Sequence, residues 1–215
     1  MHGTRVDDEL DRQVRTLHDL GYPALAGMSG ADLDVLLEPL RPMAHRAGAE
    51  AAPGAGTEDG RLPFLLVVAS SLVPTTEAVA RWSVKGRSGW TDMADELADY
   101  RPIDGVEVPD APVYLLVDVD TGPATLGVCP DDALPRVRAA GRTPLTIDEG
   151  VALVTQHPTV LTDRNAFQAL GSRATNKRVP SFWVSKGAPR LGWCWAGNPH
   201  SWLGAASAAG RQGSG

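Results

Sequence analysis

The sequence predicts an α+β fold, with a mixed or antiparallel central sheet of about four to five strands that is flanked by helices. Two continuous apolar runs, residues 62–69 and 113–119, have the length and composition of strands that are buried on both faces. Residues 179–185 and 190–196 form two further strand-like runs, joined by the short glycine-containing connection that a hairpin uses. Helical segments interrupt the strands without the regular alternation of a parallel sheet, so a mixed or antiparallel arrangement is expected.

A helical hairpin is expected at the N-terminus. Apolar residues recur at helical spacing over residues 6–20, and the following Gly-Tyr-Pro ends this segment. Ser29 is a suitable N-cap for a second helix, which presents leucines on one side and ends near Pro42. Residues 47–60 are rich in Ala, Gly and Pro and contain no large apolar residue, as is typical of a flexible linker. The expected domains are therefore a helical hairpin at 1–46, a linker at 47–60 and a main α+β domain at 61–215.

Several helices are expected in the main domain. Thr146 and Glu149 fit the capping-box pattern at the start of one of them. Ser201 can cap a last helix, which Gly210 can end. The expected helical segments are residues 76–84, 91–100, 130–140, 146–157, 163–170 and 202–209.

Charge is distributed unevenly along the chain. The protein carries 20 Lys and Arg and 26 Asp and Glu, a net charge of −6 at pH 7. From Leu161 onward there are seven Lys and Arg residues and one acid, Asp163, which gives this segment a net charge of +6. The rest of the chain has 13 Lys and Arg residues and 25 acids, a net charge of −12. This difference fits either an unevenly composed solvated surface or a local anion site on an acidic protein. The acidic remainder argues against general nucleic-acid binding.

The composition predicts a cytoplasmic protein with no membrane association. A length of 215 residues suits one substantial core, and the two cysteines form no disulfide framework. The N-terminus is acidic and lacks the apolar segment of a signal peptide. The longest apolar run, residues 62–73, is interrupted by proline and serine and is too short to span a bilayer.

Several long phrases resemble a known family. They are Tyr114-Leu-Leu-Val-Asp-Val-Asp-Thr-Gly, Pro144-Leu-Thr-Ile-Asp-Glu-Gly, Leu170-Gly-Ser-Arg, Arg178-Val-Pro-Ser-Phe-Trp-Val-Ser and Leu191-Gly-Trp-Cys-Trp-Ala-Gly-Asn-Pro-His-Ser-Trp-Leu-Gly. Together they resemble an uncharacterised actinobacterial family, a domain of unknown function, over nearly the whole chain. The resemblance implies an actinobacterial cytoplasmic protein and no particular activity. It also implies that the family's shared phrases concentrate between residues 161 and 210.

This C-terminal stretch is the candidate functional region, and it holds four of the six tryptophans. Strand alternation puts Trp193 and Trp195 on one face, where they either belong to the core or form an aromatic wall. A helix that begins at Ser201, beside Asn198 and His200, would offer free N–H groups to an anion. We therefore expect binding of a small anionic metabolite, aromatic or nucleotide-like in character. The predicted ligand-binding residues are Arg173, Lys177, Arg178, Trp193, Trp195, Asn198 and Ser201.

Two alternative functions stay open. Cys194 could act as a nucleophilic thiolate with His200 as its base, in a thiol-dependent transferase or hydrolase, if nearby cations lowered its pKa. It could equally be an inert cysteine on a face of small side chains. The tryptophans could instead face a protein partner, as in a protein-interaction module. The sequence assigns no cofactor and leaves enzymatic activity open.

No metal ligands are assigned, and the sequence leaves open whether a metal binds; one Mg²⁺ could sit at Asp118 and Asp120. Asp118 and Asp120 follow a hydrophobic strand as an Asp-x-Asp pair, but the acidic pair of a phosphatase does not follow at the required distance. Four further residues are of types that ligate zinc, but no two of them have ligand spacing: Cys129, His157, Cys194 and His200.

Overall fold

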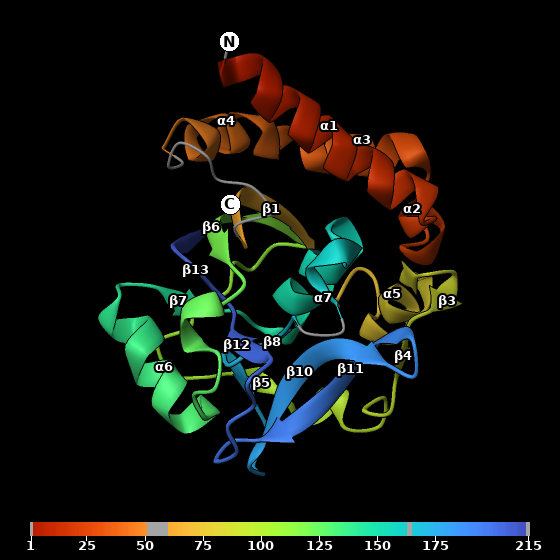
Figure 1. Ribbon diagram of the computed structural model, residues 1–215. Helices are drawn as coiled ribbons and strands as arrows, with labels where there is room; N and C mark the ends of the chain where they lie inside the picture. The colour runs from red at the N-terminus through yellow and green to blue at the C-terminus, as the bar shows by residue number, and fades with distance from the viewer. Residues whose placement is uncertain (1, 51–59, 163–164, 214–215) are drawn as a thin grey trace.

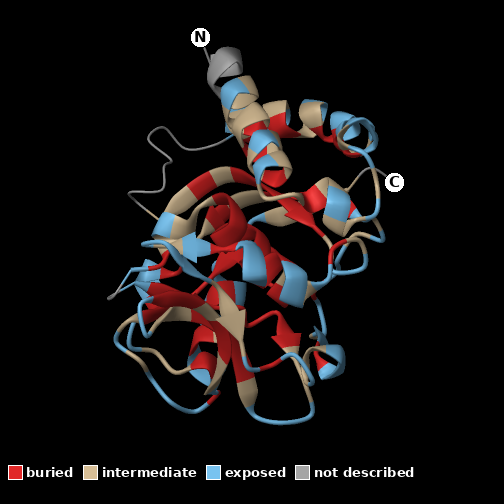
Figure 2. Ribbon diagram, turned by 90° about the vertical axis from the view of Figure 1, so that its right-hand side faces the viewer, coloured by how far each residue is buried: buried red, intermediate tan, exposed pale blue. Residues whose placement is uncertain are grey.

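The computed structural model describes residues 2–50, 60–162 and 165–213, and it confirms the mixed α+β class (Figure 1). Two five-stranded sheets carry most of the strand residues. The N-terminal helices lie above the first sheet, and helix α7 (Ile147–Gln156) lies between the two sheets. Buried residues gather around α7 and the strands, whereas the surrounding loops are exposed (Figure 2).

The predicted N-terminal helices are present, with one difference in extent. They are α1 (His2–Asp19), α2 (Tyr22–Leu25), α3 (Gly30–Leu37), the 3-10 turn η1 (Glu38–Leu40) and α4 (Arg41–Glu50). Ser29 caps α3 as expected, because its hydroxyl accepts a hydrogen bond from the Asp32 N–H at 3.2 Å. The chain does not leave the helix near Pro42. Pro42 instead lies in the first turn of α4, where a missing N–H costs no hydrogen bond. Residues 47–50 are therefore helical, and residues 51–59 of the expected linker lie outside the described residues, so the division into domains stays a prediction.

Helix α1 is attached to the first sheet through a buried polar side chain. The Gln13 side chain is fully buried, and its Oε1 accepts a hydrogen bond from the Leu66 N–H at 2.7 Å. Leu66 belongs to β1 (Arg61–Val68), which is an edge strand. Gln13 therefore satisfies a backbone donor that the edge of the sheet would otherwise leave unpaired.

The first sheet is built around β6 (Val113–Asp120). This strand pairs antiparallel with β1, β13 (Ser207–Ala208) and β14 (Gly210–Gly213), while β7 (Thr143–Pro144) pairs with β13. The two strands predicted from continuous apolar runs are thus β1 and β6. Leu65, Leu66, Leu115 and Leu116 are buried to 1% exposure or less, as expected for strands covered on both faces.

The second sheet contains the predicted hairpin. Its order is β12 (Leu203–Ala205), β8 (Ala166–Gln168), β10 (Arg178–Ser185), β11 (Ala188–Trp195) and β4 (Trp90–Thr91). Lys186 and Gly187 connect β10 to β11 with φ of 53° and 77°, the positive values that a tight two-residue hairpin turn requires.

The remaining short elements are α5 (Thr75–Arg81), β2 (Ser83–Val84), β3 (Arg87–Ser88), η3 (Leu97–Asp99), β5 (Arg101–Pro102), η4 (Pro123–Thr125), α6 (Pro130–Ala139), η5 (Pro158–Val160) and β9 (Ser172–Arg173).

Three of the predicted helices are wrong. Residues 91–100 form no α-helix: Thr91 ends β4, and the short turn η3 follows at Leu97–Asp99. The Thr91 hydroxyl does accept a hydrogen bond from the Met93 N–H at 3.1 Å. Residues 166–168 form strand β8 between β10 and β12. Residues 202–209 form β12 and β13 where a helix was expected. Their small side chains allow close backbone packing, since a Cβ on Gly204 would lie 2.3 Å from the Gly122 carbonyl oxygen. Tertiary packing overrides the helix preference of this alanine-rich segment.

Candidate functional site

The β10–β11 hairpin sorts the predicted site residues onto two faces. Arg178 is paired with Trp195, and Pro180 with Trp193, so Arg178 and both indoles share one face. Cys194 is paired with Val179 on the opposite face. The alternation expected from the sequence is confirmed, and it separates the predicted thiol from the predicted aromatic wall.

The first face carries an indole–arginine cluster, formed by Arg178, Trp193, Trp195 and Glu96. The Arg178 guanidinium lies 4.2 Å from the centre of the Trp193 ring, and Trp195 meets Trp193 edge-on with ring centres 5.2 Å apart. Glu96 accepts two hydrogen bonds from Arg178 Nη1, at 2.5 and 2.7 Å. Trp195 is 47% exposed, which is unusual for a side chain of this size. The cluster is therefore an ordered surface in which one indole stays open to solvent.

Other charged groups lie around this cluster. Burial raises the pKa of the Tyr100 phenol, as does Glu96, whereas Arg178 and Arg173 act on it in the opposite direction. Arg173 donates from Nη1 to the carbonyl oxygens of Leu170 and Ser172 at 3.1 and 3.2 Å, and burial lowers the pKa of its guanidinium. Backbone carbonyl groups thus hold the Arg173 guanidinium in place. Arg173 and Arg178 both lie close enough to Tyr100 to act on the pKa of its phenol.

Three predicted ligand residues are exposed. Lys177 precedes Arg178, and its carbonyl oxygen accepts a hydrogen bond from the Ala196 N–H. Asn198 and Ser201 lie in the turn that follows β11. Ser201 lies in a turn that leads into strand β12 at Leu203. The helix N-terminus that we expected to hold an anion is therefore absent from this described segment. The positive end of a helix dipole therefore gives no support to an anion site at Ser201.

The opposite face has its own aromatic row. Arg190 lies between the rings of Trp90 and Trp183, 4.4 and 4.5 Å from their centres, and pairs with Asp92. Trp202 meets Trp183 edge-on at 6.3 Å, and His200 lies 5.5 Å from Trp202. His200 thus packs against an indole at the end of this row. Trp90, Asp92 and Glu96 were not predicted as site residues, and the last two come from residues 91–100, where a helix was expected.

The structure does not join Cys194 to His200. Among the described residues, no hydrogen bond links the two side chains. Burial raises the pKa of the Cys194 thiol, against smaller opposing effects of Ser181 and Arg190. A catalytic cysteine requires the opposite shift, toward the thiolate. The raised pKa of the thiol and the lack of a hydrogen bond to His200 among the described residues fit the inert cysteine that the sequence also allowed.

We expect Cys194 to resist alkylation in the folded protein. In a Cys129→Ser background, iodoacetamide should label Cys194 slowly at neutral pH, faster as pH rises toward its raised pKa, and fully once the protein is unfolded. Mass spectrometry of the labelled protein over a pH series measures this. Rapid labelling of the folded protein at neutral pH would contradict the inert assignment and restore the thiol hypothesis.

The aspartates at the end of β6 make ion pairs with arginines. Asp118 accepts a hydrogen bond from Arg142 Nη1 at 2.6 Å, and Asp120 from Arg61 Nε at 3.3 Å. Within residues 2–50, 60–162 and 165–213, no group of three or more His, Cys, Asp and Glu side chains is arranged to hold a metal ion. In the same ranges, no helix combines the length and the apolar character needed to cross a membrane.

The fold and the indole–arginine cluster define an α+β protein with two five-stranded sheets and an aromatic, cationic hairpin. A family model matches residues 16–214, and the chain belongs to that family, the family of unknown function DUF5701. No curated protein and no solved structure matches the chain. The family resemblance drawn from the sequence phrases is confirmed over nearly the whole chain.

Proposed function

We propose that the protein binds a small anionic metabolite, aromatic or nucleotide-like in character, at the indole–arginine cluster. The observation that carries this proposal is the in-register pairing of the exposed Trp195 with Arg178, whose guanidinium already lies on Trp193. An open indole beside an ordered guanidinium offers a stacking surface and a directed cation within one small area.

Arg178 retains hydrogen-bonding capacity for a ligand. Glu96 occupies only its Nη1, and among the described residues Nε and Nη2 donate no hydrogen bond. The ion pair with Glu96 therefore orients the guanidinium without using all of its donors. A carboxylate or phosphate oxygen can accept from the free edge of the guanidinium.

The charge around the cluster is mixed. Arg173, Lys177 and Arg178 contribute three positive charges, while Glu96 pairs with Arg178, Asp92 also acts on Arg178, and Asp131 acts on Arg173. The anion is therefore recognised by directed hydrogen bonds from the Arg178 guanidinium and not by an excess of positive charge.

Trp195 and Lys177 are exposed, so replacing either side chain should leave the fold intact during a binding test. Adenosine monophosphate and benzoate should stabilise the protein in a thermal-shift assay and quench its indole fluorescence, whereas adenosine and inorganic phosphate alone should do so more weakly. Trp195→Ala should weaken adenosine monophosphate binding about fivefold or more. Lys177→Ala should weaken it by about two- to fivefold, in a salt-dependent manner.

Lys186→Ala is the matched control, because this exposed lysine lies in the turn at the other end of the same hairpin. It should leave binding unchanged. The proposal fails if neither anionic probe binds, or if Trp195→Ala binds adenosine monophosphate as tightly as the wild type does.

A further inference from the structure

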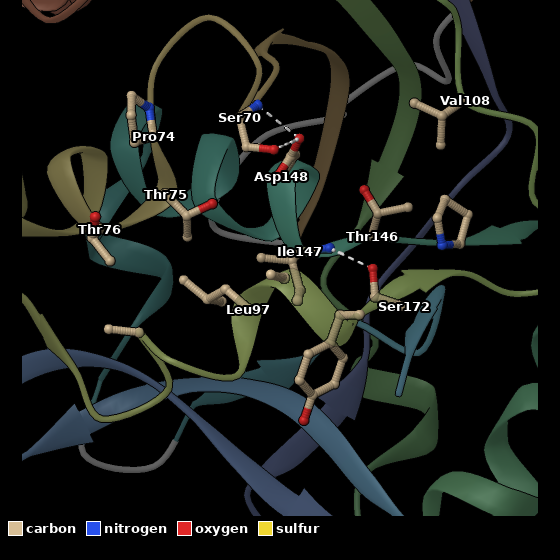
Figure 3. A pocket seen from close by; sticks show the side chains of 14 residues that line it. Ser70, Pro74, Thr75, Thr76, Leu97, Val108, Thr146, Ile147, Asp148 and Ser172 are labelled. Atoms are coloured by element: carbon tan, nitrogen blue, oxygen red, sulfur yellow. Dashed lines mark hydrogen bonds between the residues drawn. The ribbon is translucent and has the colours of Figure 1, made fainter. Parts of the chain in front are cut away.

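A separate cavity of about 440 Å³ lies at the N-terminal end of α7 (Figure 3). The start of α5, the segment around η3 and the first turn of α7 form its walls. None of the residues of the indole–arginine cluster lines it. Figure 3 shows Asp148 and Ser70 at one side of this cavity, with Leu97, Ile147 and Ser172 at the other.

Asp148 presents a half-satisfied carboxylate to this cavity. Its Oδ2 accepts hydrogen bonds from the Ser70 N–H at 2.8 Å and from the Ser70 hydroxyl at 2.9 Å. Among the described residues, Oδ1 accepts no hydrogen bond. Burial raises the pKa of Asp148, and the two bonds from Ser70 partly oppose that shift. Pairing with a cation would stabilise the ionised form of a carboxylate held in this way.

No described residue supplies that cation within the cavity. The described lining residues include no Lys, Arg or His, and Asp148 is the only carboxylate among them. The neighbouring Glu149 is already paired with Arg211 at 2.5 Å, so Arg211 does not compensate Asp148. An anionic ligand would therefore meet a negative charge that no described cationic side chain of the lining neutralises, whereas a cationic ligand would neutralise it.

The other walls define the rest of the ligand. Leu97 and Ile147 present apolar surface, and the Ser172 hydroxyl accepts a hydrogen bond from the Ile147 N–H at 3.0 Å, which leaves its own proton to donate. We propose that this cavity binds a small primary amine, whose ammonium group donates to Asp148 Oδ1 and whose hydrocarbon part packs on Leu97 and Ile147. This site is distinct from the indole–arginine cluster in position and takes a ligand of the opposite charge.

Three probes of equal length separate charge from shape: n-butylamine, n-butanol and butyrate. In two-dimensional ¹H–¹⁵N NMR titrations, n-butylamine should shift the amide signals of Ser70, Asp148 and Ser172, and butyrate should not. Asp148→Asn keeps the shape of the side chain and should weaken n-butylamine binding about tenfold or more, while n-butanol binding stays unchanged. Asp19→Asn removes an exposed carboxylate of α1 outside the cavity and should have no effect.

A second variant tests the location independently of the charge. Ala98 lines the cavity and is exposed, so Ala98→Leu should fill space without disturbing the core, and it should also weaken n-butylamine binding. Three results would overturn the proposal. They are the absence of n-butylamine shifts in the wild type, equal binding by wild type and Asp148→Asn, and butyrate binding as strong as that of the amine.

Discussion

Replacing Arg211 with methionine should destabilise the protein by about 3–5 kcal/mol, because the change leaves a buried carboxylate without its partner. The Arg211 side chain is 5% exposed and that of Glu149 is 0% exposed. Arg211 donates from Nε and Nη2 to the two carboxylate oxygens of Glu149 at 2.5 and 2.8 Å. The Tyr114 hydroxyl and the Thr146 N–H also donate to Glu149, at 3.1 and 2.7 Å. Arg211 thus joins the C-terminal strand β14 to the start of α7.

Urea denaturation of three variants measures this effect. Arg211→Met should show the full loss, and adding Glu149→Gln should recover part of it, since the second change removes the unpaired charge. Arg15→Met is the matched control on an exposed arginine of α1 and should change the free energy of unfolding by less than about 0.5 kcal/mol. A loss in Arg211→Met no larger than in this control would show that the ion pair contributes nothing to stability.

This ion pair illustrates what sequence patterns cannot predict. The capping-box pattern correctly predicts that Glu149 bonds the Thr146 N–H. The partner, Arg211, follows Gly210, beyond the last helix or strand that the sequence predicts. Contacts between residues 62 positions apart leave no trace in local periodicity, so the buried network emerges only from the fold.

The strands differ in how strongly the sequence specifies them. Residues 62–69 and 113–119 are predictable because strands buried on both faces need unbroken apolar runs. Residues 202–209 consist mostly of small side chains, which favour a helix locally but also permit the parallel pairing of β12 with β8. In the candidate site, alternation along β11 predicts that Trp193 and Trp195 share a face. Glu96 could not be predicted, because it reaches Arg178 from a distant turn.

Replacing Phe182 with alanine should cost about 3–5 kcal/mol of the free energy of unfolding, because the ring fills the space between α7 and the second sheet. Phe182 is fully buried, stacks on Phe167 with ring centres 4.7 Å apart, and lies 6.1 Å from the Trp82 ring. Phe182→Leu should cost under about 1.5 kcal/mol, since it retains most of the volume. Urea denaturation measures both variants. Equal losses would contradict the prediction, since they would show that retained side-chain volume does not replace the aromatic ring.

A double-mutant cycle that combines Gly150→Ala with Phe182→Ala tests the contact between α7 and the Phe182 ring. Gly150→Ala should change the free energy of unfolding with opposite sign in the two backgrounds. A Cβ on Gly150 of α7 would lie 2.4 Å from Phe182 Cζ. Gly150→Ala should therefore destabilise the wild type by about 1–3 kcal/mol. This loss outweighs the helix propensity of alanine, which favours it over glycine by roughly 1 kcal/mol. In the Phe182→Ala background the clash is absent and the added methyl group occupies vacated space. The same Gly150→Ala change should then stabilise. If it destabilised both backgrounds equally, α7 would be positioned by contacts other than the Phe182 ring, and its placement between the two sheets would need another physical cause.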